Sequence, residues 1–335
     1  MWSALFILFI LLIKNFGYNI SMRLSSKIKV AVVRGGESDA YPSSLKTGGH
    51  ILSTLREMPE IYEPIDIFIS KDGEWHREGL VDNPHKVLRY VDVVWNALHG
   101  KYGEDGQAQR ILESLKVPFT GSSAVASALS MDKDMAKRIY RRHSLLTPEH
   151  ELIREGDDDI RDKLITIFRS YLHPVIVKPA NASGSLGVRK VSTFEELQEA
   201  IEDTFEYSPR VMVEEFIGGD EATCMVIEGA KGETRPNVPF GTGEAIYALQ
   251  PVSKSGNLQT EESKKIEEMA KRAHEVLGLR HYSSSDFLIT PRNRIYILET
   301  NSLPEIHTQS IAYNSLSSTG WHSRDFVNHV IGLVM

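Results

Sequence analysis

The chain of 335 residues has almost no cysteine and no excess of basic residues. Its single cysteine, Cys224, can form neither an internal disulfide nor a cysteine-rich zinc site, and such usage is typical of a reducing compartment. We therefore expect a cytoplasmic protein. With 38 Lys and Arg against 45 Asp and Glu, the chain carries a net charge of −7 and lacks the basic excess with which nucleic-acid-binding proteins neutralise phosphates. No nucleic-acid partner is expected.

Long hydrophobic runs are also scarce. The first thirteen residues are almost wholly apolar, but this run ends at Lys14, short of the ~20 residues that a membrane-spanning helix needs. A secretory signal would have a Lys or Arg before its apolar run, and none precedes this one. We interpret residues 1–27 as an extension outside the folded domains, and we favour a translation start at Met22 over a short membrane-associated segment. A membrane partner is expected only if residues 1–21 are retained, and deleting them should leave activity intact.

Hydrophobic residues make up 41% of the chain and charged residues 25%, which is typical of a soluble globular protein of two or three domains. Alternating strand and helix patterns predict an α/β domain with a parallel sheet over residues 28–121. A small α+β module is predicted over residues 122–216, beginning with one helix from Ser123 to His143. Residues 217–335 are predicted to form a C-terminal α+β domain.

A lysine at the end of a predicted strand begins the most informative segment in the middle of the chain. Lys178 lies in the strand 174–179, and small residues that include Ser183 and Gly184 follow it. A fixed cation beside backbone N–H groups that a ligand can approach closely suits a polyphosphate. From these residues alone, an ordinary hairpin loop with an exposed lysine remains the alternative.

Three oxygen-bearing residues near the end of the chain form a second cluster. Strands are predicted over residues 287–290 and 294–298, joined by a short turn, so that Asp286 can lie beside Glu299. The i, i+2 spacing points Glu299 and Asn301 to the same face. Two carboxylates and an amide, without cysteine or histidine, suit Mg²⁺, which keeps its remaining sites for water and substrate phosphates. The alternative, two unrelated surface carboxylates, is disfavoured by the apolar residues around them.

Two further segments have the composition of ligand-binding loops. Glu214–Ile217 end a strand before a Gly-Gly turn, where backbone groups can meet the edge of an adenine, and Glu221 can bind ribose hydroxyls. Taken alone, this segment is an edge strand. The segment His99–Gly106 follows an apolar strand, at the position where open parallel sheets bind their ligands.

The four segments, in this order and at this spacing, resemble the ATP-grasp superfamily and, within it, the D-alanine:D-alanine ligases. The similarity spans residues 28 to about 334, and its most specific motifs are His99–Gly106, which reads HGKYGEDG, and the segment Thr120–Lys133. The resemblance implies an ATP-grasp architecture, in which an α/β domain with a parallel sheet precedes a central lid and a C-terminal α+β domain. It also implies a homodimer.

The resemblance assigns most of the clustered residues to ATP and to two Mg²⁺ ions, for which Mn²⁺ can substitute. It implies that the metal ions are bound by Asp286, Glu299 and Asn301. The lysines would contact the phosphates, Glu214–Ile217 the adenine and Glu221 the ribose. The ATP-binding set that it implies is Lys133, Lys178, Ser183, Gly184, Glu214, Glu215, Phe216, Ile217 and Glu221.

By the same resemblance, the protein is expected to be an ATP-dependent carboxylate–amine ligase that forms a dipeptide, with D-alanine as the expected substrate. ATP phosphorylates the carboxylate of the first amino acid, and the amine of the second attacks the acyl phosphate. The product would serve the synthesis of peptidoglycan precursors for the cell wall. Catalytic roles are expected for Glu37, His99 and Ser185, and substrate contacts for Glu305 and Ser310.

The amino-acid half of this site departs from the family. Ala40 stands where the family has a glutamate that meets the ammonium of the first substrate, and Gly184 where it has a catalytic serine, although Ser185 is adjacent. Ser284 replaces an arginine that stabilises the developing oxyanion, and Glu305 replaces a glycine. The Lys-Tyr pair of the family's mobile loop has no clear match in residues 240–248.

These departures leave two alternatives open. One is an ATP-grasp ligase for a different amino acid or amine pair, in which Glu305 attracts a cationic amine. The other is a nucleotide-binding protein without ligase turnover.

Overall fold

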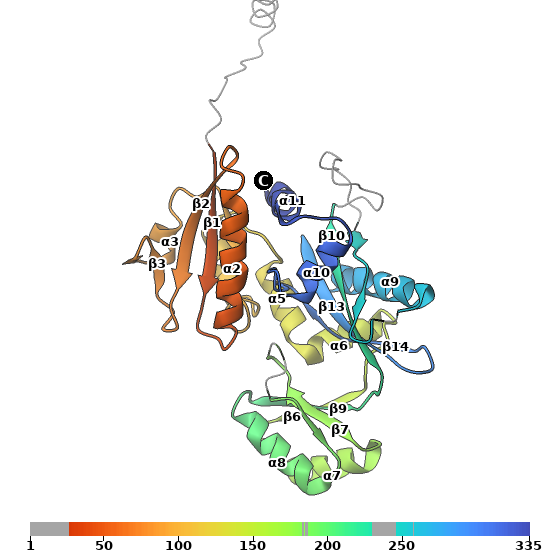
Figure 1. Ribbon diagram of the computed structural model, residues 1–335. Coiled ribbons are helices and arrows are strands. Elements are labelled where there is room, and N and C mark those ends of the chain that lie inside the picture. The colour runs from red at the N-terminus through yellow and green to blue at the C-terminus, as the bar shows by residue number, and fades with distance from the viewer. Residues whose placement is uncertain (1–26, 183, 185–186, 230–245, 257) are drawn as a thin grey trace, which may run out of the picture.

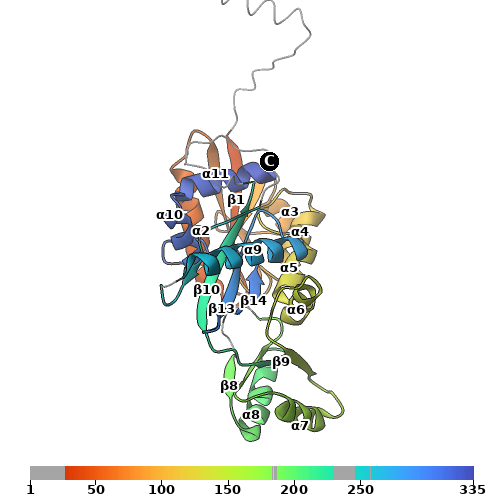
Figure 2. The ribbon, with the colours of Figure 1, turned by 90° about the vertical axis from the view of Figure 1, so that its right-hand side faces the viewer.

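The computed structural model describes residues 27–182, 184, 187–229, 246–256 and 258–335 and contains three β-sheets (Figure 1). Two of the sheets lie side by side. The remaining sheet, with helices α7 (Ile160–Ser170) and α8 (Phe194–Phe205), projects from one end of the molecule (Figures 1 and 2). This is the arrangement of an α/β domain followed by two α+β units, as the sequence predicts.

The first sheet has the strand order β4-β3-β2-β1-β5, and its strands β1, β2 and β5 are parallel, as predicted. The antiparallel hairpin β3–β4 extends one edge and was not predicted. Gly35 ends β1 with φ of 97°, and a Cβ there would meet the carbonyl of Ile69, so a glycine is required at this turn. The elements are β1 (Ile28–Gly35), α2 (Tyr41–Arg56), β2 (Tyr62–Ile69), β3 (Trp75–Arg77), β4 (Leu80–Val81), α3 (Pro84–Val87), β5 (Val93–Asn96) and α4 (Gln107–Ser114).

The second sheet is antiparallel, with the order β6-β9-β7-β8. One of its faces packs on α7 and α8 through an apolar core that includes Val177, Val213 and Leu197. Strand β6 and helix α7 were not predicted, because acidic residues dominate the segment between them. The elements are β6 (His150–Arg154), α7 (Ile160–Ser170), β7 (Val175–Pro179), β8 (Arg189–Val191), α8 (Phe194–Phe205) and β9 (Arg210–Glu215).

The third sheet follows directly in the chain, with the order β11-β10-β13-β14 and β12 paired to β10. Helix α9 covers one face, where Cys224, Phe287 and Ile297 are fully buried. The turn predicted between two strands joins β13 to β14, and Asn293 adopts φ of 57° there. The elements are β10 (Asp220–Glu228), β11 (Ile246–Ala248), β12 (Val252–Ser253), α9 (Thr260–Val276), β13 (Tyr282–Ile289), β14 (Ile295–Asn301), α10 (Ile311–Ser318) and α11 (Ser323–Val334).

The single helix predicted from Ser123 to His143 is two helices, α5 (Ala124–Met131) and α6 (Lys133–Arg142). Asp132 breaks it, because its backbone is extended and its side chain accepts the N–H of Met135 to cap α6. Both helices pack on β14 of the third sheet, where Tyr140 donates a hydrogen bond of 2.8 Å to Thr300. The predicted boundary at residue 122 instead grouped them with the central module.

The first and third sheets share one apolar core. Trp95 of β5 stacks on Tyr282 of β13, and Phe326 of α11 contacts both rings edge-on. Helix α11 lies against α2 and β5, so the last helix ties the first sheet to the third (Figure 2). Within the described part of the chain, no helix is both long enough and apolar enough to cross a bilayer.

A buried histidine between the first and third sheets makes the stability of the fold depend on pH. His281 is 9% exposed, and its Nδ1 accepts a hydrogen bond of 3.0 Å from the backbone N–H of Gly121. Burial lowers its pKa to about 4, whereas the unfolded chain titrates near 6.5. The unfolded state therefore binds the proton first, so the stability is intact above pH 6.5 and falls as the pH falls towards 4.

We expect His281 to account for about 2 kcal/mol of the stability lost between pH 7 and pH 4.5. Urea unfolding at the two pH values should show a smaller loss in His281→Asn, because Asn does not titrate and tolerates the positive φ of 67° at this position. Equal losses in the two proteins would contradict this account.

Candidate active site

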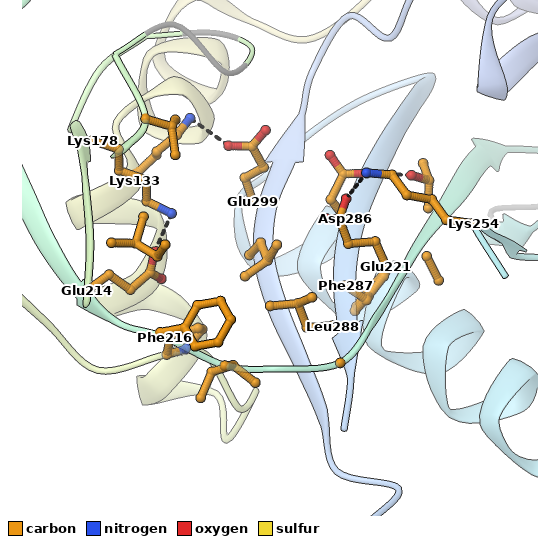
Figure 3. Close-up of a pocket in the computed structure, with 18 of the residues that line it drawn as sticks. Lys133, Lys178, Glu214, Phe216, Glu221, Lys254, Asp286, Phe287, Leu288 and Glu299 are labelled. Atoms are coloured by element: carbon orange, nitrogen blue, oxygen red, sulfur yellow. Dashed lines mark hydrogen bonds and ion pairs between the residues drawn. The ribbon is translucent and has the colours of Figure 1, made fainter. Parts of the chain in front are cut away.

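The largest group of predicted site residues lines one cavity of about 840 Å³ between the second and third sheets (Figure 3). Apolar side chains that include Phe216 and Leu288 lie at one end, and charged side chains lie at the other (Figure 3). The predicted residues in its wall are Lys133, Lys178, Gly184, Glu214, Glu215, Phe216, Ile217, Glu221, Asp286 and Glu299. These residues span more than 160 positions of sequence, and the fold brings them together.

Strand alternation in the second sheet explains why its charged residues face the cavity. Val177 and Val213 point into the core beneath α7 and α8, so their neighbours along the strands point to the opposite face. Ile176 pairs with Glu214 across the strands, and Lys178 pairs with Met212. Lys178 and Glu214 therefore share the face that lines the cavity.

Glu214 holds two lysines in the buried wall of the cavity. Its carboxylate forms ion pairs with Lys178 and with Lys137 of α6, and Lys137 also donates a hydrogen bond of 2.7 Å to Thr147. Lys137 has no exposed surface. Burial would raise the pKa of Glu214, but the two ammonium groups outweigh it and hold that pKa below its usual range. Burial lowers the pKa of Lys137 to about 8.

Lys137 was missed in the sequence. It lies four residues after Lys133 on the same helix, so the two ammonium groups share one face of α6. That spacing was the available signal, but it does not reveal that Lys137 is buried against Glu214.

Two carboxylates of the third sheet lie opposite each other. Strand register pairs Thr223 of β10 with Asp286 of β13, and Asp286 with Glu299 of β14. The hydroxyl of Thr223 donates a hydrogen bond of 2.6 Å to Asp286. Burial, and then the charge of Glu299, raises the pKa of Asp286 to about 6.

A β-bulge makes this pairing possible. On the side of the turn between β13 and β14, Phe287 pairs with Ile297. If this pairing continued without a shift, Leu298 would lie opposite Asp286, and the side chain of Glu299 would point into the core under α9. The register shifts at this point, leaving Leu298 as the extra residue and Glu299 as the partner of Asp286.

Lys133 lies at the boundary between the lysines and the carboxylates. Its Nζ lies 2.6 Å from Glu299 and donates a hydrogen bond of 2.8 Å to the carbonyl of Ala182 (Figure 3). An adjoining cavity of about 30 Å³ is lined by Lys133 and Glu299 together with Asn301 and Glu104. Asn301 accepts the N–H of Leu303 at 2.9 Å through its amide oxygen.

The carboxylates fit a cation that arrives with other ligands. Asp286 and Glu299 are adjacent and partly buried, and the raised pKa of Asp286 reflects first its burial and then the charge of Glu299. In the described ranges no group of three or more His, Cys, Asp or Glu could hold a metal ion. Water and a substrate would therefore have to complete the shell of a hard cation such as Mg²⁺.

The other side of the cavity carries a further ion pair that was not predicted. Lys254, just after β12, pairs with Glu221, and both are largely exposed (Figure 3). Glu215 faces away from this pair, because its carboxylate accepts the N–H of Glu149 at 2.9 Å. Lys190 lies 3.8 Å from the centre of the Phe216 ring.

The residues predicted for the amino-acid substrates lie outside this cavity. The Nε2 atom of buried His99 lies 2.9 Å from the hydroxyl of Thr47. Ser310 is buried and caps α10 by accepting the N–H of Tyr313. The carboxylate of Glu37 lies beside Gly73, in the turn between β2 and β3. The carboxylate of Glu305 lies 2.9 Å from His307 Nε2, and Ser43 is near enough to lower its pKa.

Some predicted residues lie outside the described part of the chain. They are Ser183, Ser185, residues 1–26 and the segment 240–245, which includes most of the expected mobile loop. Ser284, in place of the family's arginine, lies directly opposite Asn301 across β13 and β14.

The buried lysine gives a direct test of how the cavity wall is held. Removing the charge in Lys137→Met should lower the free energy of unfolding by about 3 kcal/mol, because part of the buried charge of Glu214 loses its partner. A second substitution, Glu214→Gln, should recover part of that loss. Denaturant titration measures both, and the exposed Lys265→Met should change stability by less than about 0.5 kcal/mol. Equal effects at positions 137 and 265 would show that Lys137 is not the partner described.

Known proteins share this fold, and their similarity in sequence extends over most of the chain. The model of the D-ala D-ala ligase C-terminus matches residues 140–332, and that of the D-ala D-ala ligase N-terminus matches residues 77–122. The D-alanine–D-alanine ligase of Aquifex aeolicus is 34% identical over 313 residues, which cover 91% of this chain and all of that protein.

Solved structures agree with this similarity. The VanG D-Ala:D-Ser ligase of Enterococcus faecalis is 27% identical, with a TM-score of 0.79 over 92% of this chain and all of that one. The D-alanine–D-alanine ligase of Bacillus anthracis complexed with ATP is 26% identical, with a TM-score of 0.72 over 91% of this chain and 96% of that one. By its sequence and its fold, this chain belongs to the D-alanine–D-alanine ligase family.

Proposed function

We propose that the protein joins two molecules of D-alanine at the expense of ATP, in the synthesis of peptidoglycan precursors. The observation that carries this proposal is the single cavity in which two lysines and two carboxylates converge beside an apolar end. A nucleotide needs an apolar slot for its base, cations for its phosphates and carboxylates for its metal ion. All three are present in that order along the cavity.

The nucleotide would lie with its base among Phe216, Ile217 and Leu288, next to the backbone that follows β9. Glu221 would bind the ribose hydroxyls in place of its present partner Lys254. Lys133 and Lys178 would then neutralise the phosphates. Glu214 keeps Lys178 in place, and the charge of Lys137 lets Glu214 do so without remaining an unpaired buried anion.

We propose that Asp286, Glu299 and Asn301 hold two Mg²⁺ ions, for which Mn²⁺ can substitute. Bound there, the ions would neutralise the charge that develops on the transferred phosphoryl group. Lys133 touches both Glu299 and the loop that follows β7, so the metal and phosphate subsites share one boundary.

The proposed reaction transfers one phosphoryl group and forms one peptide bond. A carboxylate oxygen of the first D-alanine attacks the γ-phosphorus of ATP, and the bond from that phosphorus to the ADP oxygen breaks. The neutral amine of the second D-alanine then attacks the acyl carbon, loses a proton and expels inorganic phosphate. The chain's own task is to position the groups, neutralise charge and exclude water, so no protein nucleophile is needed.

We propose that the amino acids bind next to the metal subsite. Glu104 lines the small cavity with Lys133, Glu299 and Asn301, and it also accepts the N–H of Gly100 at 3.0 Å. His99, next to this turn, is proposed to contact the first substrate, and Ser185 to close over the reacting groups. Ser310 is proposed to lie at the second substrate. We further propose that the protein acts in the cytoplasm as a homodimer, with no nucleic-acid partner.

D-alanine should stimulate release of ADP by the purified protein in the presence of Mg²⁺. Because Asp286 would hold the cation, Asp286→Asn should lower kcat by about 100-fold or more. The exposed Glu202→Gln of α8 serves as the matched control and should keep the wild-type rate. If neither D-alanine nor any other amino acid stimulates ADP release by the wild-type protein, the proposed function is wrong.

A further inference from the structure

We propose that Glu305 binds the ammonium group of the first amino acid, a role that the glycine-rich loop after β1 does not fill in this chain. The proposal rests on the proposed function, because only an amino-acid ligase needs such a group. It names a residue of the loop after β14 as a determinant of substrate specificity.

The chemistry demands an anion at this place. The first amino acid presents its carboxylate to the phosphoryl group, while its own amine takes no part in the reaction and stays protonated at neutral pH. An ammonium group taken from water into a partly buried site needs a negative partner.

The loop after β1 does not supply that partner. It leads into α2 through Ala40, which precedes the helix and has no polar side chain. The carboxylate of Glu37 instead lies against Gly73, so close that a Cβ at that glycine would stand 2.5 Å from its Oε1. It is thereby directed to the turn between β2 and β3, and the other acid of the loop, Asp39, is exposed.

Glu305 reaches the same place from another element. Ser43, in the first turn of α2 three residues beyond Ala40, lies near enough to this carboxylate to lower its pKa. His307 Nε2 lies 2.9 Å away, and His99 is near enough to act on its charge. These neighbours come from the first sheet's helix, from the loop after β5 and from the loop after β14.

The carboxylate is held but not enclosed. Burial would raise the pKa of Glu305, but the neighbouring Ser43 and His307 outweigh it and hold the pKa below its usual range. The side chain is still 42% exposed, so one side of the carboxylate is open to a ligand. Ser302, three residues earlier in the same loop, lines the small cavity of Lys133 and Glu299, so the loop that carries Glu305 begins at the proposed metal subsite.

Removing the charge in Glu305→Gln tests the proposal. The KM for the first D-alanine, measured by ADP release, should rise by about 10- to 100-fold, which corresponds to loss of one charged hydrogen bond. The KM for ATP should not change. Propionate has the same carboxylate and methyl group without the ammonium, so its inhibition constant should not rise in this variant.

A second pair of variants separates this role from a structural one. The double variant Ala40→Glu, Glu305→Gly moves the carboxylate to the position just before α2. The KM for the first D-alanine should then fall back towards the wild-type value. The exposed Glu63→Gln of β2 controls for loss of an acid on the same domain and should change no constant.

Three outcomes would overturn the proposal. They are an unchanged KM in Glu305→Gln, an equal rise in the constants for D-alanine and propionate, and an effect confined to the second substrate. A rise of the KM in Glu37→Gln with none in Glu305→Gln would return the role to the loop after β1. Each of these outcomes compares a variant with a wild-type protein that turns over. They are therefore distinct from failure of the proposed function, in which the wild-type protein shows no turnover.

Discussion

The whole site depends on the placement of Asp286 and Glu299 side by side on one face of the third sheet. Two carboxylates at this distance repel each other, and burial adds to the cost, which is why the pKa of Asp286 is raised to about 6. The sheet tolerates them because Thr223 donates a hydrogen bond to Asp286 and Lys133 pairs with Glu299. The surrounding elements therefore serve to place an unfavourable pair of charges where a cation can relieve it.

The second sheet is joined to this site by charge rather than by an apolar core. Its own core faces α7 and α8, and the opposite face offers Lys178 and Glu214 to the cavity. Lys137 comes from α6, which packs on the third sheet, so the ion pairs of Glu214 link the two units.

Much of the fold and of the metal subsite could be predicted from the sequence, because they follow from patterns of neighbouring residues. The parallel strands β1, β2 and β5 follow from β-branched runs that alternate with helices, and the hairpin β13–β14 follows from its turn residues. The adjacency of Asp286 and Glu299 was also predicted. The bulge at Leu298 that produces it was not, because a one-residue shift in register depends on packing between strands.

Other features depend on contacts distant in sequence and could not be read from local patterns. At Asp132 the helix could either continue or end. The ion pair with Arg210 of β9 favours the end, at which Asp132 caps α6. The burial of Lys137 and the position of Glu305 beside Ser43 are set by elements 77 and 262 residues away, respectively.

The central claim is that Asp286 and Glu299 require a cation that arrives with the nucleotide. Calorimetric titration of the protein with a non-hydrolysable ATP analogue, with and without Mg²⁺, tests it most directly. The account predicts tight binding only when Mg²⁺ is present, because the triphosphate otherwise adds negative charge beside Asp286 and Glu299. Equal affinity in the presence and absence of Mg²⁺ would contradict it.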